Sequence, residues 1–124
     1  MSEISSIQIE LPLVALRGLT VMPDMIIHFD LSRDFSKAAV EHAMTETQQI
    51  FLVAQKNPEQ DTPTGEDLYQ YGTVALIKQI TRLPNDIDRV LVEGQYKAKM
   101  TETRDNDGYF SAILEQIEDL SLIH

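Results

Sequence analysis

The stretch TVALIKQITRLPNDIDRVLVEGQYKAKMTE, residues 73–102, holds two long segments of alternating apolar and polar residues on either side of a turn-like sequence. The alternation and the many β-branched residues predict strands at residues 73–83 and 90–102. Residues 84–88 read PNDID, and Asn85 and the aspartate after it tolerate the left-handed backbone of a tight turn. The stretch therefore predicts one long β-hairpin.

Two features predict that this hairpin is bent. Val74 and Leu76 share one phase of the alternation, whereas Ile77 belongs to the other phase, so a β-bulge is expected there. Gly94 has no side chain to pack and marks a bend or a second bulge. In the returning strand, three residues are expected to face the core and three to face solvent: Tyr96, Ala98 and Met100 against Gln95, Lys97 and Lys99.

The remaining strands are shorter. Pro12 has no N–H to donate to a ladder, which favours an edge strand or a strand start at that position. Together with the hairpin and one helix, the short strands predict an α+β, mainly β fold, built as a small closed or partly closed barrel. Four more strands are predicted at residues 11–16, 25–31, 50–54 and 109–117. A second tight turn is predicted at residues 104–108.

One segment, residues 33–46, has helical periodicity. Ser32 is expected to cap its start, and Asp34 falls in its first turn, where negative charge is favourable. The buried stripe is expected to contain Phe35, Ala39, Val40, Ala43 and Met44, with Ser36, Lys37 and Glu41 on the opposite side.

The longest connection, residues 56–72, contains two prolines and no apolar periodicity until Leu68. It is predicted to be a surface loop with a short turn near residues 67–69. Loops of this length are often functional or mobile.

Composition and charge limit the possible functions. The chain has 124 residues, enough for one domain with its own core, and 43% of them are hydrophobic. It has no cysteine, which removes disulfides, thiol nucleophiles and cysteine-ligated metals. The formal net charge of −10 argues against nucleic acid and against anionic membrane surfaces as partners. No apolar run is long enough to span a membrane, and the start of the chain does not resemble a signal peptide, so a cytoplasmic location is expected.

Motifs for catalysis and metal binding are not found. The sequence has neither a phosphate-binding glycine loop nor GxSxG, so no catalytic residue is assigned. His28, His42 and His124 lack zinc-ligand spacing and are expected to be isolated surface residues. The turn at 103–108 is a poor calcium loop, because the first and twelfth loop positions are not acidic. We therefore expect neither a metal nor a cofactor in this chain.

Three stretches together resemble the amino-terminal domain of Lon, the ATP-dependent serine protease. The opening LPLVALRGLTVMPDMII, residues 11–27, is similar to a family pattern of L-P-L-x-P-L-R, apolar residues, a proline and a second strand. Residues 50–55 are similar to a hydrophobic-LVAQ motif. Residues 67–100 are similar to D-L-Y-x-x-G-T-x-A-x-I, a hairpin turn and V-x-V-x-G-x-x-R-A. The resemblance covers residues 9–118 in the order and spacing of the family.

Some positions depart from the family pattern. Ala15 replaces a common proline, and His28 stands where another proline is frequent. The turn at 84–88 lacks the usual glycine, and Lys97 stands where an arginine is usual. These departures affect local strand edges more than the assignment to the family.

The resemblance implies a PUA-like small β-barrel of about six strands with one main inserted helix. It divides the chain into a flexible start at residues 1–8, the Lon-type β domain at residues 9–118, and residues 119–124. The last segment is either the start of a following helical segment or an artificial chain end. In full-length members of the family, an AAA+ ATPase that uses ATP and Mg²⁺ and a Ser-Lys protease domain follow.

The resemblance also implies a function that is not catalytic. It implies a domain for substrate recognition and assembly in a protease that degrades misfolded and regulatory proteins, with unfolded or degron-bearing proteins and other Lon subunits as partners. A stand-alone degron or small-molecule receptor is the alternative, and RNA binding rests only on the PUA-like fold. By itself the chain is expected to be a monomer or a weak dimer, because its acidic surface opposes association.

The connection between the first two strands is the candidate substrate contact. A loop is harder to bury completely than a strand, because its backbone polar groups need partners. Leu19, Met22, Pro23 and Met25 are therefore expected to form an exposed apolar patch. Flexible methionines suit varied apolar ligands, so these residues are the predicted substrate-binding site.

Overall fold

The computed structural model describes residues 8–61 and 63–117, and the predicted mainly β fold with one main helix is confirmed. Of the predicted flexible start, only Gln8 is described, and it begins the first strand. The expectations for residues 1–7 and 119–124, and for His124, lie outside the described residues. No helix in this part of the chain has the length and hydrophobicity that a membrane span needs. In chain order the elements are β1 (Gln8–Leu16), β2 (Ile26–Leu31), α1 (Asp34–Met44), β3 (Gln49–Ala54), the 3₁₀ turn η1 (Gly65–Asp67), β4 (Tyr71–Leu83), the 3₁₀ turn η2 (Pro84–Asp86), β5 (Ile87–Asp105) and β6 (Phe110–Gln116).

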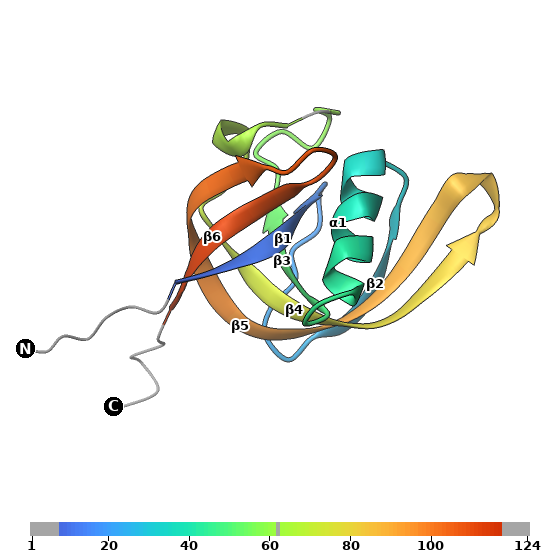
Figure 1. The fold of residues 1–124 in the computed structure, drawn as a ribbon, viewed down its shortest axis with the longest axis horizontal. Coiled ribbons are helices and arrows are strands. Elements are labelled where there is room, and N and C mark those ends of the chain that lie inside the picture. The colour runs from blue at the N-terminus through green and yellow to red at the C-terminus, as the bar shows by residue number, and fades with distance from the viewer. Residues whose placement is uncertain (1–7, 62, 118–124) are drawn as a thin grey trace, which may run out of the picture.

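Most of the strands close into a ring. The hydrogen-bonded order is β2-β5-β4-β3-β1-β6, and β6 also pairs with β5, which closes the path from β5 through β4, β3, β1 and β6. β1 and β3 run parallel, whereas the other pairs are antiparallel. β2 lies outside this ring along the first half of β5, and α1 packs mainly on β1 and β3 (Figure 1).

The hairpin of β4 and β5 is bent as predicted. Its register shifts between Val74 and Ala75, opposite Gly94, and again after Ile77. At the turn, Asn85 and the following aspartate have φ of 65° and 64°, in the predicted left-handed region. Because of the bend, one half of β4 and one half of β5 belong to the ring. The other halves of the two strands extend from the ring as an arm (Figure 1).

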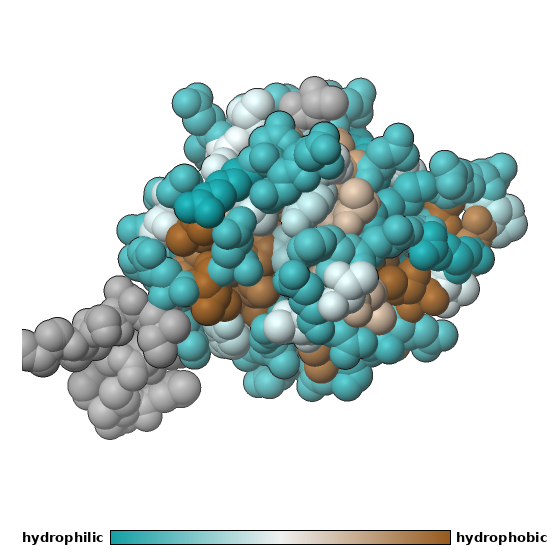
Figure 2. Space-filling model, in the orientation of Figure 1, coloured by the Kyte–Doolittle hydropathy of each residue, from teal (hydrophilic) through white to brown (hydrophobic). Residues whose placement is uncertain are grey.

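Apolar residues gather in two cores, one on each face of the ring wall. Because alternate residues of a strand point to opposite faces, β1 contributes to both cores. The visible surface in Figure 2 is mostly hydrophilic, with separate hydrophobic patches. The inner core holds Leu11, Leu13, Ala15, Phe51, Val53, Leu68, Val74, Ala98, Met100, Ala112 and Leu114. The outer core, which includes α1, holds Val14, Leu16, Val21, Phe29, Leu31, Ala39, Val40, Ala43, Ile50, Leu52, Ala75, Ile77, Val90 and Val92.

Pro12 lies neither on an edge strand nor at a strand start, so that prediction was wrong. It sits inside β1, between β6 and β3. The pairing of β1 with β6 ends at Pro12, opposite Ser111, and the ladder with β3 begins at Leu13. A residue without an N–H is tolerated at this position because the strand changes partners there. The edge strand of the described sheet is β2.

Three predictions about the side chains of α1 were also wrong. Arg33 is the N-cap and no side chain caps the helix, so Ser32 does not have the expected role. Ser36 is fully buried rather than facing solvent, while Met44 is 37% exposed and Phe35 is half-buried. The small Ser36 side chain faces the strands, and its hydroxyl has no hydrogen-bond partner. The buried stripe follows i, i+3, i+4, i+7 spacing and contains Ser36, Ala39, Val40 and Ala43.

Polar side chains hold the loop that follows β3. Arg33 Nη1 donates to Gln55 Oε1 at 2.7 Å, and Arg33 Nη2 donates to the Ala15 carbonyl at 2.7 Å. Gln55 is buried, and its Nε2 donates to the carbonyls of Asn57 at 3.0 Å and Gln60 at 2.9 Å. Burial lowers the pKa of the Arg33 guanidinium from its ordinary value. The loop is therefore fixed to the ring at its start by a partly buried polar network.

Candidate functional site

The connection between β1 and β2 is held against the outer face of the ring. Val21, near its middle, is buried, and its carbonyl accepts a 2.6 Å hydrogen bond from Thr73 Oγ1 of β4. Thr73 is itself buried, so water cannot easily replace this bond. The contact fixes the middle of the connection and leaves side chains on either side of it at the surface.

Gly94 of β5 fixes the end of the same connection. The Asp24 N–H donates to the Gly94 carbonyl at 2.9 Å, and the Gly94 N–H donates to the Met25 carbonyl at 2.8 Å. The Met25 N–H donates to the Met22 carbonyl at 3.1 Å, which closes a turn in which Asp24 has φ of 72°. A Cβ at position 94 would overlap the Met22 carbonyl oxygen, so this close approach requires glycine.

An apolar groove of about 270 Å³ lies between this connection and the start of β4. The end of β1, the connection, β3, the start of β4 and one residue of β5 form its walls. The two tyrosines that line it, Tyr69 and Tyr71, are 51% and 59% exposed. The lining includes Leu16, Leu19, Met22, Tyr69, Tyr71 and Lys97.

The structure places two of the four predicted substrate-binding residues in this groove. Leu19 is half-buried, packs against the outer core and lines the groove. Met22 is 41% exposed and also lines it. Pro23 and Met25 do not line the groove, because they follow Met22 into the turn that is fixed on β5. Met25 is 36% exposed, and its Sδ accepts a hydrogen bond from the Met22 N–H at 3.3 Å.

Sequence reasoning did not identify the two tyrosines and the lysine of the groove. Tyr69 and Tyr71 lay in the segment predicted to be a loop, although their i, i+2 spacing could have indicated a shared side of an extended segment. Lys97 was expected only to face solvent. The β4–β5 register places it opposite Thr73, and thereby beside the groove. That pairing joins residues far apart in sequence, which a local pattern does not reveal.

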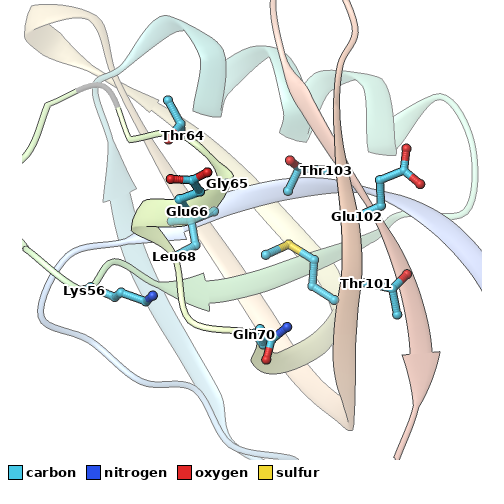
Figure 3. A pocket seen from close by; sticks show the side chains of 10 residues that line it. Lys56, Thr64, Gly65, Glu66, Leu68, Gln70, Thr101, Glu102 and Thr103 are labelled. Atoms are coloured by element: carbon cyan, nitrogen blue, oxygen red, sulfur yellow. The ribbon is translucent and has the colours of Figure 1, made fainter.

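A second hollow of about 580 Å³ opens between η1 and the second half of β5. Figure 3 shows that Lys56, Glu66 and Glu102 surround it, so its charges are of both signs. Three threonines and Gln70 add to its polar lining. The apolar groove agrees with the exposed apolar patch expected from the sequence, whereas charged and polar side chains line much of this hollow, so the groove is the better candidate site.

Some titratable side chains outside the groove have structural contacts. Within residues 8–61 and 63–117, no group of three or more His, Cys, Asp or Glu side chains could hold a metal ion. His28 is exposed, whereas His42 is not isolated, since its ring stacks on Tyr109 at 4.8 Å and its Nε2 lies 3.4 Å from a Glu46 carboxylate oxygen. Burial, with smaller effects from nearby carboxylates, raises the pKa of Tyr109 above its ordinary value. The stacking of His42 on Tyr109 joins α1 to the residue just before β6.

Thr73→Val is expected to loosen the connection that forms one groove wall. Valine keeps the volume of threonine but leaves the buried Val21 carbonyl without its partner, which costs about 1–3 kcal/mol of unfolding free energy. Urea denaturation of both proteins measures the change. Thr81→Val, at an exposed position on the arm, is the control and is expected to change stability by less than about 0.5 kcal/mol. Equal losses in the two variants would contradict a special role for the Thr73 bond.

Comparisons with known sequences agree on one family. Residues 10–123 match the family model described as the ATP-dependent protease La (LON) substrate-binding domain. The chain is 45% identical over 108 residues, 87% of its length, to the Lon protease of Clostridioides difficile (strain 630). It is 43% identical over 118 residues, 95% of its length, to the Lon protease of Desulforamulus reducens. In both cases the chain spans 14% of the length of the relative.

Comparisons with solved structures agree on the fold. The N-terminal domain of the Mycobacterium avium complex Lon protease superposes with a TM-score of 0.72 at 18% identity, covering 89% of this chain and 55% of that one. A Lon N-terminal domain protein from Xanthomonas campestris gives a TM-score of 0.67 at 14% identity, covering 89% and 60%. At these identities the likeness concerns the arrangement of strands and helix alone.

Proposed function

Because the chain belongs to the family of LON substrate-binding domains, we propose that it is the non-catalytic domain that recognises substrates and supports assembly in an ATP-dependent Lon-type protease. The chain spans 14% of the length of its Lon protease relatives. In this proposal the rest of such a protein supplies the ATP- and Mg²⁺-dependent serine peptidase activity. The domain itself contributes neither a catalytic residue nor a cofactor, and its substrates are misfolded and regulatory proteins.

The apolar groove is the observation that carries this proposal. Folded proteins bury most large apolar side chains, whereas unfolded segments expose them to water. Removing apolar surface from water stabilises a complex by about 25 cal/mol for each Å² buried, before the cost of ordering the segment. Met22 and Tyr71 are exposed at the groove, and methionine and tyrosine contact apolar partners of many shapes. Such a surface suits weak binding of many different unfolded segments.

Other subunits of the same protease are the second class of partner that we propose. For the domain alone we propose a monomer or weak dimer, because a net charge of −10 makes two copies repel each other. Salt screens this repulsion beyond about 10 Å at 0.1 M, so self-association should increase with ionic strength. The absence of cysteine fits the reducing cytoplasm, where we place the protein.

Met22→Asp is expected to weaken binding of a labelled, permanently unfolded protein about tenfold, which corresponds to about 1.4 kcal/mol. The carboxylate would place a charge in an apolar groove and would have to be desolvated on binding. Fluorescence anisotropy at about 0.1 M and about 1 M salt measures the affinity. Because the contact is apolar, binding by the wild type should persist at the higher salt concentration.

Met44→Asp is the matched control for this experiment. Met44 is 37% exposed, close to the 41% of Met22, but it lies at the end of α1 and does not line the groove. This variant should bind like the wild type, provided that thermal unfolding shows it to be folded. If Met44→Asp loses as much affinity as Met22→Asp, or if Met22→Asp loses none, the groove is not the binding site.

A further inference from the structure

The charge at the groove differs in sign from that of the whole chain. The sequence has 20 acidic and 10 basic residues, yet none of the described residues that line the groove carries a carboxylate. Within residues 8–61 and 63–117, Lys97 is the one charged residue in the lining, and it is exposed. The described residues include no ion-pair partner for it, whereas Lys37 and Lys78 pair with Asp86 and Glu93. The groove therefore presents an ammonium group beside an apolar wall.

The strand register places this ammonium group beside the exposed aromatic side chains. Lys97 lies opposite Thr73, and Lys99 lies opposite Tyr71, so all four residues share one face of the β4–β5 pair. Lys97 and Tyr71 are diagonal neighbours, a distance that long side chains can bridge. In the pairing of β5 with β6, Glu115 lies opposite Lys99 rather than Lys97. Among the described residues of β6, this carboxylate therefore lies directly across from the lysine outside the groove.

We propose that Lys97 makes the groove select extended segments in which an acidic side chain lies next to apolar or aromatic residues. The proposal rests on the proposed function, because it concerns the same groove and the same class of unfolded substrate. The apolar residues would fill the groove, and the carboxylate would meet the Lys97 ammonium. An acidic segment is otherwise repelled by a domain of charge −10, so Lys97 offsets this repulsion locally.

An acidic side chain fits this position better than a free carboxyl terminus. Proteins commonly capture a terminal carboxylate with several backbone N–H groups. Around Lys97 the backbone is engaged in pairing, since Lys97 pairs with Thr73, Ala98 pairs with Gln116, and the Lys97 carbonyl accepts a bond from Ile117 at 3.1 Å. The groove thus offers one flexible ammonium group, which recognises charge without demanding the geometry of a chain end.

Labelled peptides with one apolar and aromatic core test the proposal. The first peptide carries Glu after the core, the second carries Gln at that position, and both have amidated carboxyl termini. The third peptide has Gln and a free carboxyl terminus. Exposed ion pairs contribute modestly, so the wild type should bind the Glu peptide about two- to fivefold more tightly than the Gln peptide at low salt. The preference should shrink at about 1 M salt.

Variants of Lys97 and Lys99 distinguish an effect of the charge at the groove from an effect of the net charge of the domain. Lys97→Gln should abolish the preference for the Glu peptide, and Lys97→Glu should reverse it. Lys99→Glu changes the net charge as much as Lys97→Glu does, but it lies outside the groove lining and should keep the preference.

Three results would overturn the inference. Equal binding of the Glu and Gln peptides by the wild type would do so while leaving the proposed function intact. Tighter binding of the third peptide than of the Glu peptide would show that a chain end is the ligand. Loss of the preference for the Glu peptide in Lys99→Glu would show that the preference arises from the net charge of the domain. Failure of all three peptides and of unfolded protein to bind would instead refute the proposed function itself.

Discussion

Phe51→Ala should lower the free energy of unfolding by about 3–5 kcal/mol, a large part of the roughly 5–15 kcal/mol that stabilises a typical domain. Phe51 lies in the middle of β3 and is fully buried in the inner core. A Cβ on Gly72 of the neighbouring strand would overlap the Leu52 carbonyl oxygen and come within 2.7 Å of the Phe51 ring, so the ring packs directly against a glycine. Alanine would leave a cavity that the closed ring of strands can fill only by distorting several pairings.

Urea denaturation with linear extrapolation measures this loss, and an unchanged slope would show that the surface exposed on unfolding is unchanged. Tyr69→Ala is the control, because Tyr69 is also aromatic but is 51% exposed. It should cost less than about 1 kcal/mol. If Phe51→Ala were no more destabilising than Tyr69→Ala, the closed ring would not have the packed interior that the structure shows.

Gly94→Ala is expected to have the largest combined effect on stability and binding. The new methyl group would overlap the Met22 carbonyl and press on the Pro23 backbone, neither of which is a flexible side-chain end. Overpacking of this kind costs about 1–3 kcal/mol. Since the same contact fixes the turn that carries Met22, the variant should also lose affinity for unfolded protein by about tenfold.

Gly18→Ala separates the steric effect from the general cost of replacing glycine. Gly18 has φ of +70°, and no atom lies within 4 Å of the position that a Cβ would take, so alanine there costs only the left-handed backbone penalty of about 1–2 kcal/mol. Thermal unfolding and anisotropy would be measured on both variants. The expected pattern is that Gly18→Ala keeps its affinity and Gly94→Ala loses it. Normal binding by a folded Gly94→Ala protein would show that the position of Met22 does not matter.

Local chemistry explains why the hairpin could be predicted. The alternation over residues 73–102, the phase change near Ile77 and the turn chemistry of Asn85 each depend on neighbouring residues. The structure confirms the bulges and the left-handed turn. The position of the helix was predicted for the same reason, but the residues of its buried stripe were not all predicted correctly. The prediction treated Phe35 as buried and Ser36 as exposed, and packing of the helix on β1 and β3 reverses their order of burial.

The sequence by itself determined the positions of the strands and the helix, the bends of the hairpin and, through its resemblance to the Lon family, the kind of domain. Only the tertiary structure decided that β6 closes the ring onto β5, that Pro12 lies where β1 changes partners, and that Leu19 and Met22 line the same groove as Tyr71 and Lys97. The physical reason is the range of the interactions. Periodicity and turn preferences act over a few residues. The groove depends on the parallel pairing of β1 with β3, on the β4–β5 register and on one buried bond from Thr73 to Val21, each of which joins segments far apart in the chain.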